Sequence, residues 1–150
     1  MGIKVDVSQI EGFQNKLKAL NRTQRDVFFR TACSDLGNRL IALVKPRTPV
    51  KSGTLRNNWN NAAGSLGMAS VSVGANGSYS VTIENHTPYA SYVEFGHRQT
   101  PGRYVPAIGK RLKASWVEGT HMLQLSEADL SGIAPTVLQA KLDAFLRTVF

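Results

Sequence analysis

The stretch SVSVGANGSYSVTIE, residues 70–84, decides the fold class, because apolar residues recur at every second position on both sides of a short polar turn. The Gly and Asn of GANGS tolerate the positive φ angles that tight hairpin turns need. The pattern therefore predicts a β-hairpin. The apolar residues expected to share a strand face are Val71 and Val73, and then Tyr79, Val81 and Ile83.

A long helix is expected ahead of this hairpin. It would begin at Asn21 or Thr23, either of which can cap a first turn, and end at Pro46 and Pro49, because proline disfavours helix in the residue before it. Its apolar face is broader than one stripe, which predicts a core helix covered on more than one side. The apolar residues of that face are Phe28, Phe29, Ala32, Cys33, Leu36, Leu40, Leu43 and Val44.

Two amphipathic helices are predicted near the ends of the chain. Ser8 and Glu11 form a capping box that would start a helix running to residue 20. Towards the C-terminus, Pro135 suits a first helical turn. The apolar residues that follow it recur at intervals of 4, 3 and 4: Leu138, Leu142, Phe145 and Val149.

Residues 50–59 read as a turn that enters a first strand holding Leu55 and Trp59. Together with the hairpin and the helices, this pattern predicts an α+β fold, in which a small antiparallel sheet carries the long core helix and the C-terminal amphipathic helix. The length of 150 residues predicts one domain, residues 1–150.

The segment after the hairpin changes character twice. PYASYVEFG, residues 88–96, is typical of a short helix with Gly96 as its C-cap. Residues 97–106 contain two prolines and a glycine and are expected to form a loop. Residues 107–116 fit either a helix or a strand. The choice stays open because Gly109 weakens both possibilities.

The amino-acid composition indicates which kinds of partner the chain favours. Eighteen Lys and Arg against ten Asp and Glu give a net charge of +8, which favours nucleic acid or acidic protein surfaces. The single Cys33 lies within an apolar helical pattern, typical of a buried thiol in a reducing compartment. The chain has neither a run of about 18 apolar residues nor an apolar stretch of signal-peptide type, so a soluble cytosolic product without membrane contact is expected.

No catalytic or metal-binding constellation is recognised in the sequence. The chain lacks a GxSxG or SxxK element, a P-loop and a dinucleotide fingerprint. Glu94 and His97 have the spacing of an acid/base pair, but an ion pair of Glu94 with Arg98 or Arg103 is the favoured interpretation. We expect no enzyme activity, no metal and no cofactor. The histidines lack the spacing of common zinc motifs: His86, His97 and His121.

An interaction surface is the remaining candidate. Aromatic and basic side chains alternate in and after the predicted loop, a mixture that suits protein interfaces and nucleic-acid backbones alike. A solvated basic loop beside core aromatics is the alternative. The basic residues are Arg98, Arg103, Lys110, Arg111 and Lys113, and the nearby aromatics are Tyr92, Tyr104 and Trp116.

Two segments carry a resemblance to a known family: TPVKSGTLRNNW, residues 48–59, and VTIENHTPYASYVEFGHRQTPGRYVPA, residues 81–107. They resemble the tail-component family of long-tailed bacteriophages, whose members act as head-to-tail joining, neck or tail-completion proteins. The elements that match are the TPV-x-x-G-x-L-R entry, the strand ending at Asn85, the YA-x-YVE-x-G helix, an Arg-bearing loop and a C-terminal amphipathic helix. The loop is the part that departs most from the family pattern.

The resemblance implies an α+β structural protein of the virion, assembled in the host cytoplasm. It implies a hexameric ring at the head–tail junction that contacts head connector or stopper proteins and the tail tube while DNA passes. Glu94 would hold the base of the loop, and Lys110, Arg111 and Lys113 could meet the passing DNA or an acidic partner. A sequence-independent nucleic-acid-binding module is the alternative function. The residues expected to dock on a neighbouring subunit or connector are Tyr89, Tyr92, Glu94, Phe95, Arg98, Arg103 and Tyr104.

Overall fold

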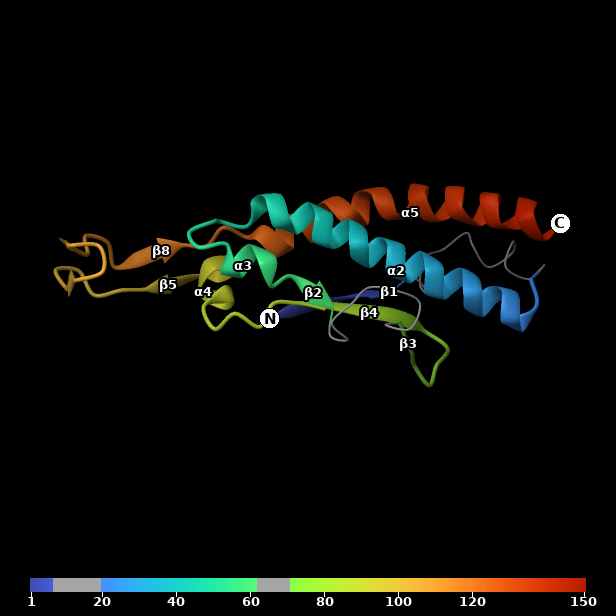
Figure 1. The fold of residues 1–150 in the computed structure, drawn as a ribbon, viewed down its shortest axis with the longest axis horizontal. Coiled ribbons are helices and arrows are strands. Elements are labelled where there is room, and N and C mark those ends of the chain that lie inside the picture. The colour runs from blue at the N-terminus through green and yellow to red at the C-terminus, as the bar shows by residue number, and fades with distance from the viewer. Residues whose placement is uncertain (7–19, 62–70) are drawn as a thin grey trace.

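The computed structural model describes residues 1–6, 20–61 and 71–150. The helix predicted from Ser8 and Glu11 lies outside the described residues. In Figure 1 the C-terminal helix, the long central helix and the sheet lie one below the other, and a slender extension leaves the body at the end opposite the C-terminus. The structure confirms the α+β class and the antiparallel sheet.

The sheet is built around β4 (Tyr79–Glu84), which is paired along both edges. β1 (Gly2–Asp6) covers one edge, with Gly2 opposite Glu84 and Asp6 opposite Ser80. β2 (Asn60–Asn61) and β3 (Ser72–Val73) share the other edge, all antiparallel to β4. The predicted hairpin is therefore confirmed. One detail differs: Val71 is buried but Val73 is 45% exposed, so the two valines do not both face the core.

The long central helix is α2 (Arg22–Arg47). Asn21 caps it, as one of the two predicted alternatives: the Asn21 side chain accepts from the Gln24 amide at 2.9 Å, and the Gln24 side chain accepts from the Asn21 amide at 3.0 Å. Pro46 fits within the last turn. The buried face confirms the predicted core helix, with the thiol of Cys33 fully enclosed. The fully enclosed apolar residues of this face include Ala32, Cys33, Leu36, Leu40 and Val44.

The C-terminal helix, α5 (Met122–Val149), packs antiparallel against α2. Contacts between the two helices run in opposite sequence order, which fixes the orientation. The pairs are Arg47 with Asp129, Asp35 with Lys141 and Phe28 with Phe145.

The start of α5 corrects the prediction that this helix begins at Pro135. It begins at Met122, and Pro135 lies exposed in its interior. Proline inside a helix costs about 3 kcal/mol. Burial of apolar side chains on both sides of it, at about 1.5–3 kcal/mol each, more than offsets that cost. The buried apolar residues are Met122, Leu123, Leu130, Ala134, Leu138 and Leu142.

Leu55 and Trp59 do not share the strand that we expected. Leu55 lies in α3 (Thr54–Asn57), a single helical turn, and only β2 follows as a strand. Gly53, with φ of 87°, turns the chain into α3. Both side chains are nevertheless buried, and the Trp59 indole Nε1 donates to the Thr48 hydroxyl at 2.8 Å.

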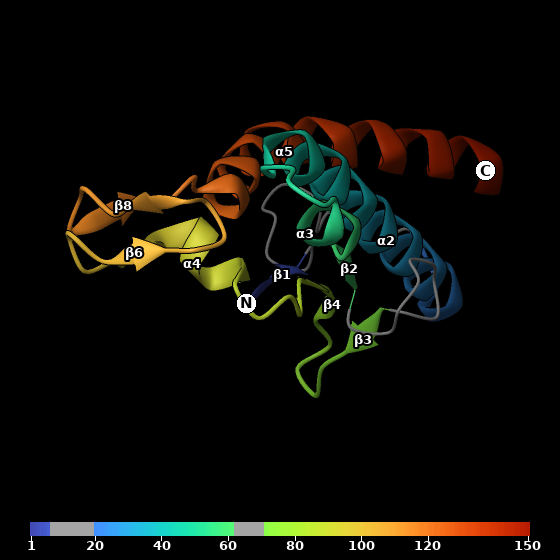
Figure 2. The same cartoon turned by 60° about the vertical axis from the view of Figure 1, so that its left-hand side comes forward.

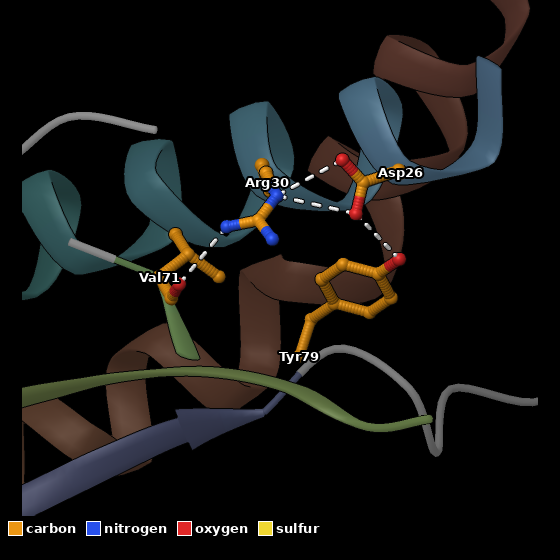
Figure 3. A network of polar contacts seen from close by, with 4 residues as sticks. All are labelled: Asp26, Arg30, Val71 and Tyr79. Atoms are coloured by element: carbon orange, nitrogen blue, oxygen red, sulfur yellow. Dashed lines mark hydrogen bonds and ion pairs between the residues drawn. The ribbon is translucent and has the colours of Figure 1, made fainter. Parts of the chain in front are cut away.

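A polar network ties α2 to the hairpin (Figure 3). The Arg30 guanidinium donates to both Asp26 oxygens, at 3.0 and 3.1 Å, and to the Val71 carbonyl at 3.1 Å. The Tyr79 hydroxyl donates to Asp26 at 2.9 Å. The hydrogen bond from Tyr79, with those from Arg30, lowers the pKa of Asp26 below its ordinary value of 3.8. The Tyr79 ring also stacks on Phe29 at 5.0 Å between centroids.

Replacing Tyr79→Phe should lower the melting temperature at neutral pH, because the Asp26 carboxylate loses a donor. Since folding depresses the pKa of Asp26, this stabilisation is present above pH 3.8 and is lost as the pH falls through the lower folded pKa. The difference between Tyr79→Phe and wild type should therefore shrink below pH 3.8. Thermal unfolding followed by circular dichroism tests this. Tyr92→Phe is the matched control, and a difference that does not vary with pH would contradict the assignment.

Candidate functional site

The slender extension is a long β-hairpin made of residues 96–118, which we call the arm (Figures 1 and 2). At its base β5 (Gly96–Arg98) pairs with β8 (Trp116–Glu118). Further out β6 (Tyr104–Val105) pairs with β7 (Lys110–Arg111). The expected loop over residues 97–106 therefore contains strands. Residues 107–116, for which helix and strand were both left open, form no helix and contain β7 and the start of β8.

The two tiers are joined through a β-bulge. The Gly102 amide donates to the Leu112 carbonyl at 2.7 Å, and the Leu112 amide donates to the Arg103 carbonyl at 2.8 Å. Gly102 and Arg103 thus face one residue, and Gly102 has the positive φ, 82°, that such bulges use. Pro101 and Gly102 occupy the positions typical of a type II turn. TPGR, residues 100–103, is therefore the signature of a specific turn, whereas the sequence analysis predicted only a loop here.

The arm has no core of its own. None of the side chains in residues 95–121 is buried. Main-chain hydrogen bonds hold the hairpin together, and isolated two-stranded hairpins are marginal in water. Three large apolar side chains are left about half exposed on it: Tyr104, Ile108 and Trp116. Phe95, directly before the arm, is exposed to a similar degree.

The arm is also strongly basic. Its five cationic side chains are all exposed, and Glu118 is its only carboxylate. Across the ladder, Arg98 lies opposite Trp116, and Tyr104 lies opposite Arg111. Arg111 donates to the Gly102 carbonyl at 2.8 Å and so braces the bulge. The cationic residues are Arg98, Arg103, Lys110, Arg111 and Lys113.

Glu94 anchors the arm to the body. It lies in α4 (Ala90–Phe95), is fully buried, and accepts from the Leu123 amide at 2.9 Å and the Gln124 amide at 3.0 Å. These amides belong to the first turn of α5, whose own N-cap, His121, provides no side-chain cap. A carboxylate at this position satisfies unpaired amides and interacts favourably with the helix dipole.

This arrangement replaces the expected ion pair. The Glu94 carboxylate faces α5, whereas Arg98 and Arg103 are exposed along the arm. Nor does it form an acid/base pair with His97, whose buried Nδ1 has no hydrogen-bond partner within the part of the chain that the structure describes.

The two ends of the arm leave the body at one tight crossing. The Val93 and Glu94 carbonyls accept from the Thr120 and His121 amides, at 2.8 and 3.1 Å. A Cβ atom on Gly119 would lie 2.2 Å from the Glu94 carbonyl oxygen, closer than any side chain allows. The crossing therefore requires glycine at position 119.

A groove runs along the base of the arm, which we call the basal groove. It consists of two adjoining hollows of about 400 and 250 Å³ that share Pro49, Tyr89 and Val93. Tyr89 and Tyr92 are 43% and 59% exposed. The His97 ring lies 5.9 Å from that of Tyr92. The other lining residues are Val117, Glu118 and Thr120 in the larger hollow, and Val50, Lys51, Ser52, Gly53 and Leu55 in the smaller.

Most of the residues selected from the sequence are exposed on the arm or lie at its base. Glu94 is the exception, because its side chain lies inside. Sequence reasoning missed Ile108 and Val117, which carry no motif.

Within residues 1–6, 20–61 and 71–150, no three His, Cys, Asp or Glu side chains are grouped so as to hold a metal ion. None of the helices in that part of the chain is long and apolar enough to cross a membrane.

Replacing Glu94→Ala should destabilise the fold by about 2–4 kcal/mol, because the buried Leu123 amide and the partly buried Gln124 amide lose their acceptor and α5 loses its cap. Urea unfolding measures this. Glu127→Ala is the matched control, since Glu127 is exposed in α5, the helix that Glu94 caps, and the change in charge is identical. The control should differ from wild type by less than about 0.5 kcal/mol. Equal stability of the two variants would show that the cap contributes nothing.

Comparison with known proteins relates the chain to a family of bacteriophage proteins. The family model described as "Bacteriophage HK97-gp10, putative tail-component" matches residues 11–96, more than half of the chain. The matched span ends at Gly96, so the rest of the arm and α5 lie beyond it. Neither the curated proteins nor the solved structures searched include a significant match to the chain.

Proposed function

The chain belongs to the HK97-gp10-like family of bacteriophage tail components, and on that premise we propose that it forms a ring at the head–tail junction. In this proposal the ring completes the tail and joins it to the head, and DNA passes through its lumen. The partners are the connector or stopper proteins of the head and the tail tube. Six copies are the expected number, and the assembled virion is the site of action.

The observation that carries this proposal is the arm without a core. The hairpin leaves Tyr104, Ile108 and Trp116 about half exposed and gains little from standing alone in water. Contact with another protein at the base of the arm would bury Trp116, together with Phe95 of α4. The arm projects from one end of the body, so it can reach a neighbour without rearrangement of the sheet (Figure 2).

The base of the arm supplies the docking surface of this proposal. Tyr89, the N-cap of α4, and Tyr92 are exposed and line the basal groove, and Phe95 is exposed at the end of α4. Exposed aromatic side chains at a hollowed surface are typical of the central contacts of protein interfaces. Glu94 positions this surface by fixing α4 to α5. Its buried carboxylate serves in the cap, and the proposed role is structural rather than enzymatic.

Ring formation predicts one discrete high-mass species. Native mass spectrometry of the purified chain across a concentration series should show a closed oligomer, expected at six copies, that persists on dilution. A chain that remains monomeric at every concentration, yet binds nucleic acid, would favour the second candidate, a free nucleic-acid-binding module. The exposed cations of the arm are the observation behind that candidate.

Docking through the arm base predicts that Tyr92→Ser combined with Phe95→Ser abolishes head–tail joining while the chain stays folded, because both side chains are exposed. Electron microscopy of particles assembled with this variant should show separate heads and tails. Val27→Ser with Ile133→Ser is the matched control, since it removes two exposed apolar side chains from the body. If head–tail joining is lost only in the control, the contact lies on α2 and α5 and not on α4.

A further inference from the structure

The cations of the arm have no acidic partner among the described residues, where Arg98, Arg103, Lys110 and Lys113 form no ion pair. Five carboxylates of the body are engaged elsewhere. The engaged carboxylates are Asp26 with Arg30, Asp35 with Arg39 and Lys141, Glu84 with His86, Asp129 with Arg47, and Glu94 at the cap of α5. A second copy carries the same surplus of +8, so self-association leaves the excess of positive charge uncompensated.

The cations are distributed around the hairpin and are not confined to one face. Lys110 and Arg111 are consecutive in β7 and therefore project to opposite faces. Arg98 comes from the other strand of the hairpin, and Lys113 lies between β7 and β8. A flat acidic protein surface would neutralise one face only. A ligand with negative charge on both sides of the hairpin would neutralise both.

We infer that the outer part of the arm, residues 98–113, binds the phosphate backbone of duplex DNA. This rests on the proposed function, which brings DNA past the ring. A two-stranded hairpin is narrow enough to enter the major groove, where a backbone runs along each side of it. Contacts with phosphates alone carry no sequence information, so binding is independent of sequence and sensitive to salt.

The test uses the full chain and two fluorescent 30-base-pair duplexes of unrelated sequence. Fluorescence anisotropy should give equal affinities for both. With four phosphate contacts for each arm, affinity should fall about a hundredfold between about 50 and 200 mM salt. Lys110→Gln with Lys113→Gln should weaken binding by about tenfold or more and flatten the salt dependence.

The matched control is Lys4→Gln with Arg56→Gln, which removes the same charge from exposed positions on the body. It should bind within about twofold of wild type if the arm, and not net charge, makes the contact. Equal weakening in the control and the arm variant overturns the inference, as does the absence of duplex binding at about 50 mM salt. If the chain binds no duplex, an acidic protein becomes the expected partner of the arm.

Native mass spectrometry of the same arm variant separates this inference from the proposed function. A ring of unchanged mass with weakened DNA binding supports both. A ring that forms from wild-type chain but binds no duplex overturns the inference and leaves the ring intact. DNA binding through the arm by a chain that forms no ring refutes the ring and keeps the arm contact. Arg98→Gln with Arg103→Gln repeats the test if the lysine variant is misfolded.

Discussion

The buried carboxylate of Glu94 is the contact on which the arrangement of this molecule depends. It connects three parts at once: α4, to which it belongs, α5, whose first turn it caps, and the crossing from which the arm departs. Burial of a carboxylate is costly unless hydrogen bonds replace water, and two backbone amides with no other acceptor do so here. The position of the arm and the start of α5 therefore have one common cause.

In the body, as at Glu94, hydrogen bonds and ion pairs join elements that also pack together through the apolar core. Arg30 and Asp26 connect α2 with the hairpin through Tyr79 and Val71 (Figure 3). Along the other side of α2, ion pairs follow the antiparallel contact with α5. Consequently many of the acidic side chains are used within the body, whereas the arm, with five cations and one carboxylate, carries half of the net charge of +8.

The sequence was informative wherever structure follows from neighbouring residues. The hairpin and the Asn21 cap of α2 each depend on a few consecutive residues, and both could be predicted. The start of α5 could not, because the local preference of Pro135 for a helix start opposes burial that extends over both sides of it. The role of Glu94 was also hidden, since its partners lie 29 and 30 residues away. The arm could have been predicted in part, because Pro101 and Gly102 are typical of a turn with a bulge.

The crossing at Gly119 has a consequence for how such a chain can diversify. Because the two ends of the arm meet where they leave the body, everything between them is topologically an insertion. Residues can be added, removed or exchanged there without moving a core side chain, so surface and binding preference can drift while the scaffold stays constant. The arm is thus a segment whose length and sequence can change independently of the scaffold, so members of a family with this design can differ in one hairpin while they share the same core.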